Sequence, residues 1–200
     1  MSWQRALLFL GVVAVLGAAT AVALSRGDAV LAAERMKPPL QSDQPPADKI
    51  LVVCFLLSFC AWVLFIAHDA SHLRLLGTPG SAVSFFGFLL FVGGWWVVYA
   101  ALRENRFAAP VVKLQRERRH VVVDSGCYGV VRHPMYAGAV PLLVGMPLWL
   151  GSYAAALLAA VPIAILAVRI VFEERFLRRS LAGYGEYTQK VRYRLLPFVW

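Results

Sequence analysis

Long apolar runs separated by short polar connections dominate this chain. Three runs each hold about 20 mostly apolar residues, the length that lets a helix cross roughly 30 Å of hydrocarbon: residues 6–24, 50–67 and 81–102. A fourth apolar block, residues 136–172, is too long for one helix and is interrupted at Gly151 and Ser152. The pattern predicts an all-α integral membrane protein with about five transmembrane helices, the last two forming a helical hairpin.

The first apolar run has a second interpretation, as a cleaved signal peptide. Arg5 precedes it, and the small residues at 21–23 resemble a cleavage site. The apolar core of a signal peptide usually holds about 7 to 15 residues, and this run is longer. We therefore expect a helix that is retained.

Composition and charge agree with a membrane protein and add a topology. Hydrophobic residues make up 60% of the chain and charged residues 16%, which is too apolar for an ordinary soluble domain. Of the 20 Lys and Arg residues, only Arg5 and Arg74 lie outside the segments 25–49, 103–135 and 169–200. Because Lys and Arg in short loops mark the cytoplasmic side, we expect the N-terminus outside and the C-terminus in the cytoplasm. Topology and attraction to anionic lipids explain the net charge of +9, so we expect no nucleic-acid partner.

Polar segments indicate how the chain is organised. Residues 36–48 contain two Pro-Pro pairs and predict an extended cytoplasmic linker. This linker lies in a first part, residues 1–102, which holds three transmembrane helices, and residues 103–200 form the second part. Near the C-terminus, residues 175–181 place apolar and basic side chains on opposite sides of a helix. They predict a cytoplasmic amphipathic segment along the membrane surface.

A histidine pair at the end of the second apolar run could hold a metal ion. His68 and His72 lie one helical turn apart, with Asp69 between them, so the two imidazoles share a helix face. No third ligand is evident nearby, and polar side chains at such a position ordinarily meet water. The three cysteines of the chain lack CxxC spacing. We expect no metal site.

The stretch RHPMY, residues 132–136, stands where the fourth apolar block begins. Pro134 lacks an N–H group and is tolerated in the first turn of a helix, so a helix is expected to start there. The free N–H groups of a helix start, together with Arg132, His133 and Tyr136, suit an anion or a carboxylate. The alternative is a capped helix whose Arg and Tyr side chains only reach toward the interface.

Three charged residues, Arg169, Glu173 and Glu174, stand at the other end of the predicted hairpin. Arg169 and Glu173 are four residues apart, so a surface ion pair worth roughly 0.3 kcal/mol is one explanation. Two adjacent carboxylates at the end of an apolar span are costly, however, which favours a functional role. Because a hairpin brings its ends together, we expect Glu173 to lie close to His133 and Tyr136 in a pocket that faces the cytoplasm.

Several motifs follow one another in a specific order. RHPMY is followed, after the hairpin, by RIVFEE and then by GYGEYTQKVRYRLLP. This succession resembles the isoprenylcysteine carboxyl methyltransferase family and its phospholipid methyltransferase relatives, which are integral membrane enzymes that use S-adenosylmethionine. The resemblance covers about residues 105–200, and the first two apolar runs carry no motif of the family. It implies that the second part of the chain, residues 103–200, is the methyltransferase catalytic region, with a cofactor-binding segment, the helical hairpin and the C-terminal tail.

The resemblance implies roles for individual residues. It implies a catalytic group of Arg169, Glu173 and Glu174, in which Glu173 holds the amino group of the cofactor and Arg169 faces and binds the substrate. It also implies a set of cofactor-binding residues: Gln115, His120, Val121, Val122, Val123, Tyr128, His133, Pro134, Met135, Tyr136 and Glu173. The neighbours of Tyr128 are a cysteine and a glycine, where the family commonly has a proline and a larger residue.

The residues and the resemblance lead to one principal hypothesis and three alternatives. The principal hypothesis is methyl transfer from S-adenosylmethionine to a lipidic or prenylated substrate that enters from the bilayer, with the carboxylate of an isoprenylated cysteine as the first choice. Such a carboxylate is already ionised, so the enzyme mainly has to position it, and the fork of Arg169 suits that task. The alternatives are a phospholipid amine or thiol methyltransferase on the same scaffold, an NADPH-dependent membrane sterol or isoprenoid reductase, and a non-enzymatic haem or structural membrane protein.

Overall fold

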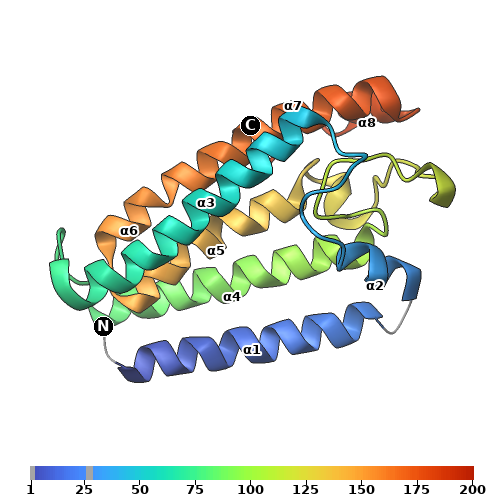
Figure 1. Ribbon diagram of the computed structural model, residues 1–200. Coiled ribbons are helices and arrows are strands. Elements are labelled where there is room, and N and C mark those ends of the chain that lie inside the picture. The colour runs from blue at the N-terminus through green and yellow to red at the C-terminus, as the bar shows by residue number, and fades with distance from the viewer. Residues whose placement is uncertain (1–2, 26–28) are drawn as a thin grey trace.

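Long helices pack side by side and form the body of the molecule (Figure 1). The computed structural model describes residues 3–25 and 29–200. The long helices are α1 (Trp3–Ser25), α3 (Pro46–His68), α4 (Ser81–Glu104), α5 (Pro134–Leu150) and α7 (Ala160–Ser180). The short helices are α2 (Ala29–Arg35), α6 (Tyr153–Leu158) and α8 (Tyr184–Lys190). A π-helical turn spans Asp69–Leu73, and the described residues contain no β-strand.

Four helical segments in the described part of the chain are long and apolar enough to cross a membrane: Gln4–Ser25, Pro46–Leu73, Ser81–Glu104 and Tyr153–Ser180. Helix α5 lies within the same bundle but has 17 residues. At 1.5 Å per residue it is about 26 Å long, slightly less than the roughly 30 Å of a hydrocarbon core. The prediction of an all-α membrane protein is therefore confirmed, and four of the five predicted spans have the full length.

The predicted helical hairpin is present. Gly151 follows α5 with a left-handed φ of 101°, a conformation that glycine adopts without steric cost, and the chain reverses there. Ser152 then caps the returning helix, because its hydroxyl oxygen accepts a hydrogen bond from the backbone N–H of Ala155 at 2.9 Å. Helices α6 and α7 run back as one nearly continuous rod, interrupted at Ala159 just before Pro162, whose nitrogen cannot donate to the helix ladder.

Helices α4 and α5 make the most extensive helix contact of the described bundle, and glycines permit it. A Cβ atom on Gly94 would lie 2.5 Å from the carbonyl oxygen of Gly138, and one on Gly138 would lie 2.8 Å from the carbonyl oxygen of Gly94. Gly87 and Gly145 face each other in the same way one layer further along. Such small residues let helix backbones approach closely in membranes. This contact fixes the position of the start of α5.

Asp69 ties the far end of α3 to the hairpin turn. Its fully buried carboxylate accepts hydrogen bonds from the Ser152 hydroxyl at 2.6 Å and from the Leu75 backbone N–H at 3.0 Å. The rings of His68 and His72 lie beside each other, with centroids 5.5 Å apart. Within the described chain, no group of three or more His, Cys, Asp or Glu side chains is placed to hold a metal ion. The HDASH stretch thus has a structural explanation in Asp69.

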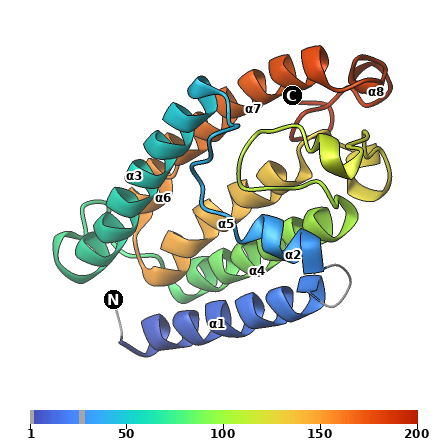
Figure 2. The same ribbon diagram turned by 45° about the vertical axis from the view of Figure 1, so that its right-hand side comes forward.

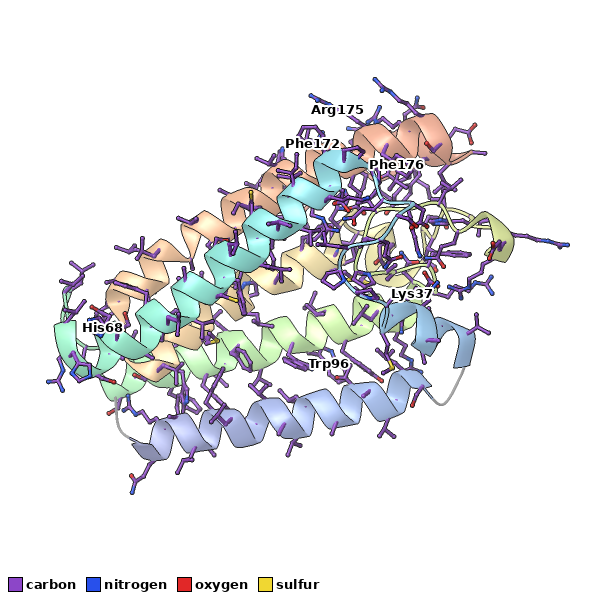
Figure 3. All side chains as sticks on the ribbon, viewed as in Figure 1. Lys37, His68, Trp96, Phe172, Arg175 and Phe176 are labelled. Carbon is purple, nitrogen blue, oxygen red and sulfur yellow. The ribbon has the colours of Figure 1, made fainter. Side chains whose placement is uncertain are left out.

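The three basic segments gather at one end of the bundle. Figures 1 and 2 show α2 with the segment that follows it, the connection between α4 and α5, and α8 at the same end. The hairpin turn and the start of α1 lie at the other end. In Figure 3, His68 lies at the opposite end of the molecule from Lys37 and Arg175. The helices therefore bring together the basic segments that the charge count assigned to one side of the membrane.

Two segments differ from their predicted form. The expected extended linker 36–48 ends inside a helix, because α3 already begins at Pro46, and Asp48 is buried where it accepts a hydrogen bond from Gln44 at 2.6 Å. The expected amphipathic strip 175–181 is helical up to Ser180, as predicted, but its Leu177 and Leu181 pack against the tyrosines of α8. Both segments pack against other parts of the protein at this end of the bundle: the charged side chain of Asp48 accepts a hydrogen bond from Arg169, and the apolar side chains of the strip contact α8.

Candidate active site

A pocket opens at the end of the bundle where the basic segments meet. About 820 Å³ of space free of protein atoms lies between its walls, including the open solvent at its mouth. The connection between α4 and α5, the first turn of α5, the end of α7 and helix α8 supply its walls. These elements come from distant parts of the sequence, and specific contacts hold them together.

The first turn of α5 is fixed by the C-terminal tail. Helix α5 begins at Pro134, as predicted, and Pro134 itself is fully buried. The backbone N–H groups of Arg132 and His133 donate to the carbonyl oxygens of Tyr193 and Arg194, each at 2.9 Å. This extended pairing joins the RHPMY motif to the tail motif and sets the direction in which the following side chains enter the pocket.

The carboxylate of Glu174 joins three of the sequence motifs. It accepts hydrogen bonds from Arg132 Nε at 2.6 Å and from Arg194 Nε at 3.0 Å, and it lies 3.3 Å from His133 Nε2. Arg132 also donates to two backbone carbonyls of the tail. A buried carboxylate is tolerated when opposite charges and hydrogen bonds compensate its lost hydration. Glu174 does not line the pocket, so its position indicates that it connects the walls.

Glu173, one residue earlier on α7, does line the pocket. The hydroxyl of Tyr136 donates to Glu173 Oε2 at 2.8 Å, so the expected proximity of these two residues is confirmed. His133 hydrogen-bonds Glu174 instead, although its side chain also lines the pocket, as does Met135. Tyr136 supplies the one hydrogen bond that the Glu173 carboxylate accepts from the described residues, and it goes to Oε2, so Oε1 has no partner there. This oxygen can accept hydrogen bonds from a cationic ligand.

Arg169 reaches the pocket from α7 and is held by a residue that the sequence analysis did not single out. Its Nε donates to Asp48 Oδ1 at 2.7 Å, and its Nη2 donates to the carbonyl oxygen of Pro110 at 2.9 Å. Asp48 Oδ2 also accepts the backbone N–H of Val112 at 3.0 Å. The guanidinium carbon of Arg169 lies 6.0 Å from the ring centroid of Tyr136. An acidic residue in the first turn of an apolar helix is the sequence signal that could have identified Asp48.

The connection between α4 and α5 forms a wall that combines aromatic and apolar side chains. The rings of Phe107 and His120 stack with centroids 4.4 Å apart, and residues 121–123 continue the wall. Burial, together with the nearby charge of Arg118, lowers the pKa of His120 below its ordinary value. Gln115 lies behind this wall, where it donates to the Phe107 carbonyl at 2.8 Å and accepts from Arg118 at 2.6 Å. Gln115 therefore shapes the wall without lining the pocket.

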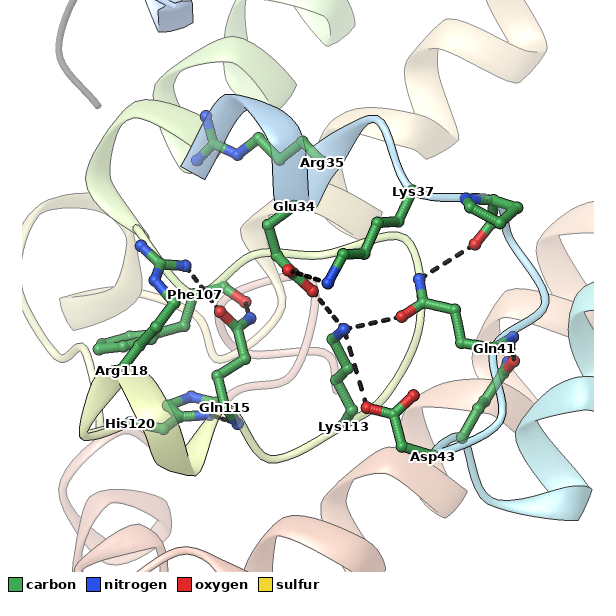
Figure 4. Close-up of polar contacts among 12 residues, drawn as sticks. Glu34, Arg35, Lys37, Gln41, Asp43, Phe107, Lys113, Gln115, Arg118 and His120 are labelled. Carbon is green, nitrogen blue, oxygen red and sulfur yellow. Dashed lines mark hydrogen bonds and ion pairs between the residues drawn. The ribbon is translucent and has the colours of Figure 1, made fainter. Parts of the chain in front are cut away.

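An ionic cluster fastens the segment after α2 onto this wall (Figure 4). The ammonium of Lys113, which lines the pocket, pairs with the buried carboxylate of Glu34 and donates to Gln41 Oε1 at 2.7 Å. Lys37 approaches Glu34 from outside, at 2.6 Å. Burial opposes ionisation of Glu34, but the two ammonium groups prevail and lower its pKa. The charged groups of this cluster thus pair with one another within the protein.

Helix α8 contributes two tyrosines that differ in their hydrogen bonding. The hydroxyl of Tyr187 donates to the backbone carbonyl of Tyr128 at 2.7 Å, which joins α8 to the turn before α5. Burial raises the pKa of Tyr128, Tyr184 and Tyr187 well above its ordinary value, so all three keep their protons. The hydroxyl of Tyr184 is buried and has no hydrogen-bond partner in the described structure.

The structure brings most of the predicted site residues to this pocket. The predicted residues that line it are His120, Val121, Val122, Val123, Tyr128, His133, Met135, Tyr136, Arg169 and Glu173. Gln115, Pro134 and Glu174 lie outside the lining. Sequence reasoning assigned no role to the pocket-lining Tyr184 and Tyr187, although both stand in the GYGEY stretch that carried the resemblance.

Comparisons with known proteins define the class. The model of the phospholipid methyltransferase family matches residues 82–183, slightly more than half of the chain. This region runs from α4 through the hairpin to the start of α8 and contains the RHPMY and RIVFEE motifs. The chain belongs to this family.

Relatives within the class have more specific names. Protein-S-isoprenylcysteine O-methyltransferase B of Arabidopsis thaliana is 33% identical over 94 residues, which cover 46% of this chain and 48% of the relative. Protein-S-isoprenylcysteine O-methyltransferase A of the same plant is 32% identical over 120 residues, covering 58% of this chain and 60% of the relative. A probable protein-S-isoprenylcysteine O-methyltransferase of Oryza sativa subsp. indica is 30% identical over 120 residues, covering 58% and 62%. The chain thus spans about half to three fifths of the relatives that it matches.

Proposed function

We propose that this chain is a membrane-embedded methyltransferase that binds S-adenosylmethionine in the pocket and methylates a lipidic acceptor. The carboxylate of an isoprenylated cysteine is the first choice of acceptor, in keeping with the names of the relatives. The observation that carries the proposal is the meeting of Tyr136, Arg169 and Glu173 in one pocket at the end of long apolar helices. At such a place a polar donor can arrive from water and a lipidic acceptor from the bilayer.

The residues of the pocket fit the methyl donor. The half-buried carboxylate of Glu173 suits its ammonium group, and the apolar residues 121–123 next to Phe107 suit the flat face of its adenine. The buried hydroxyl of Tyr184 lacks a protein partner, which points to a polar ligand atom. When bound, the sulfonium supplies an already activated methyl group.

The residues of the chain then have to position the acceptor and exclude water. A carboxylate acceptor is ionised at neutral pH, so no general base is needed. Arg169 orients one oxygen of that carboxylate through the N–H groups of Nη1, because Nε and Nη2 are engaged by Asp48 and Pro110. The pocket walls, formed by the connection between α4 and α5, the first turn of α5, the end of α7 and helix α8, exclude water from the attacking oxygen.

The proposal includes the orientation of the protein in the membrane. The three basic segments lie at one end of the bundle, which supports placing that end, the pocket and the C-terminus in the cytoplasm and the start of α1 outside. All residues that line the pocket lie within residues 103–200, and Asp48 in the first turn of α3 holds Arg169 from outside the lining. The prenyl or acyl tail enters sideways between helices.

A phospholipid amine is a second candidate acceptor, and one observation favours it. The ion pair with Asp48 offsets the charge of Arg169, so the pocket repels a cationic headgroup less than a free guanidinium would. The description of the family model also refers to phospholipids. The two acceptors therefore have to be separated by experiment.

The test is a transfer assay with radiolabelled S-adenosylmethionine and purified protein in lipid nanodiscs. The acceptors are a farnesylcysteine analogue, phosphatidylethanolamine and a simple thiol. We expect base-labile label on the farnesylcysteine analogue. Label on phosphatidylethanolamine alone would select the second candidate. Calorimetry that detects NADPH binding and no S-adenosylhomocysteine binding would overturn the methyltransferase proposal in favour of a reductase.

Arg169→Gln is the variant that separates the acceptors. We expect it to abolish transfer to a carboxylate and to spare transfer to an amine, because only the carboxylate needs a cation. Arg175→Gln is the matched control, since Arg175 is exposed on the same helix. Because Arg169→Gln also removes the ion-pair partner of Asp48, both activities are measured on protein that is still folded, and equal loss of both there would reject a role in binding the acceptor carboxylate.

A further inference from the structure

The hydroxyl of Tyr184 is a buried polar group without a partner. The side chain is 4% exposed and lines the pocket, and its Oη has no hydrogen-bond partner in the described part of the chain. The one other buried side-chain atom of this kind among the described residues, Oε1 of Glu34, lies against the ammonium of Lys113. Buried polar atoms in folded proteins nearly always have a partner. The hydroxyl of Tyr184 therefore points to a partner that is not part of the protein.

The neighbouring tyrosine shows that the local structure offers partners when a hydroxyl has to be satisfied internally. Tyr187 lies one turn further along α8, with its ring centroid 5.7 Å from that of Tyr184, and it donates to the Tyr128 carbonyl at 2.7 Å. The two side chains share one apolar cluster with Leu181 and Val191. The difference between them is thus confined to the hydroxyl groups.

The charges around Tyr184 indicate which part of a ligand it meets. Burial, followed by the negative charges of Glu174 and Glu173, raises its pKa, so the hydroxyl remains protonated and can both donate and accept. Glu174 is occupied by the guanidinium groups of Arg132 and Arg194. Glu173 lines the pocket, and among the described residues only its Oε2 has a hydrogen-bond partner. A ligand with an ammonium next to a carboxylate satisfies both groups: the ammonium binds Glu173, and the hydroxyl binds the adjacent polar atoms.

We propose that Tyr184 binds the α-amino-acid end of the methyl donor, beside Glu173, and is a ligand-binding residue of this site. The inference rests on the proposed function, because it takes S-adenosylmethionine as the donor. It assigns to the hydroxyl a role in affinity and orientation, and none in the folding of the empty protein.

The experiment compares Tyr184→Phe with Tyr187→Phe, two variants that each remove one hydroxyl from α8. Thermal unfolding is measured without ligand, and calorimetry measures binding of S-adenosylhomocysteine and of 5′-methylthioadenosine, which lacks the amino-acid end. For Tyr184→Phe we expect an unchanged or higher ligand-free Tm, an S-adenosylhomocysteine Kd raised about tenfold, and a methylthioadenosine Kd within about twofold of wild type. For Tyr187→Phe we expect a lower ligand-free Tm, because a protein hydrogen bond is lost.

Each other outcome has a defined meaning. A lower ligand-free Tm for Tyr184→Phe would show a protein partner and overturn the inference. Unchanged S-adenosylhomocysteine affinity, or equal loss for both ligands, would overturn it as well, because the amino-acid end would then not be what the hydroxyl binds. Failure of the wild-type protein to bind S-adenosylhomocysteine would instead overturn the proposed function.

Discussion

Asp48 and Arg169, from helices far apart in the sequence, form an ion pair at the edge of the pocket, with 2.7 Å between Oδ1 and Nε. Both side chains are largely withdrawn from water, and Asp48 also accepts the backbone N–H of Val112. The pair connects α3, α7 and the connection between α4 and α5 at one point. It therefore couples the orientation of the arginine to the packing of the helices.

Removing one partner of this pair is expected to destabilise the protein. Asp48→Ala leaves the guanidinium of Arg169 without a counter-charge and frees the N–H of Val112, and we expect a loss of about 3 kcal/mol in unfolding free energy. Chemical unfolding in detergent measures it. Asp43→Ala is the control, because the exposed Asp43 lies 3.8 Å from Lys113 and is expected to change little. Equal stability of the two variants would contradict a structural role for Asp48.

The adjacent carboxylates of α7 are expected to separate folding from ligand binding. Glu174→Gln removes the charge that pairs with Arg132 and Arg194, and we expect a loss of about 3 kcal/mol of stability. Glu173→Gln can still accept from Tyr136, so its ligand-free Tm is expected to stay near wild type while its Kd for S-adenosylhomocysteine rises about tenfold. Thermal unfolding and calorimetry on the same samples provide both quantities. If Glu173→Gln lowered the stability and Glu174→Gln raised the Kd instead, Glu174 and not Glu173 would be the carboxylate that faces the pocket.

The contact between α4 and α5 is expected to tolerate no side chain at its glycines. Gly94→Ala introduces a Cβ 2.5 Å from the Gly138 carbonyl oxygen, a backbone atom that cannot move away cheaply, and we expect about 2 kcal/mol of destabilisation. Gly93→Ala is the matched control, because no atom lies within 4 Å of its added Cβ. Its stability is expected to equal or exceed that of wild type. The comparison is made by thermal unfolding, and a less stable Gly93→Ala would refute the packing argument.

The stability of the protein is expected to depend on pH through His120. The unfolded chain takes up a proton at this residue near pH 6.5, whereas burial and Arg118 lower the pKa in the folded protein. The contribution of His120 is therefore full above about pH 6.5 and is lost as the pH falls below that value. The Tm is measured at pH 5.5 and at pH 7.5, and the difference between the two values is expected to be smaller for His120→Gln than for wild type. His72→Gln, at the far end of the bundle, should retain the wild-type difference.

The sequence predicted the hairpin and half of the pocket because local features determine them. Pro134 is well suited to the first turn of a helix because it lacks an N–H group, and Gly151 permits the left-handed turn that ends the helix. The expected proximity of Glu173 and Tyr136 followed from the hairpin, which brings its two ends together. Only the end of the linker was misjudged: α3 begins at Pro46, and the proline pairs contain no information that Asp48 reaches Arg169.

By itself, the sequence determined that the chain forms apolar helices, where they begin and turn, and which motifs belong to a methyltransferase-like site. Backbone groups in a bilayer must be satisfied within their own helix, so the length and composition of each run are sufficient. Only the tertiary structure decided that Glu174 pairs with Arg132 and Arg194 outside the pocket lining, and that the hydroxyl of Tyr184 lacks a partner among the described residues. Neighbouring residues on a helix point about 100° apart, and the packing of the tail and of α3 against α7 selects the direction that becomes the site.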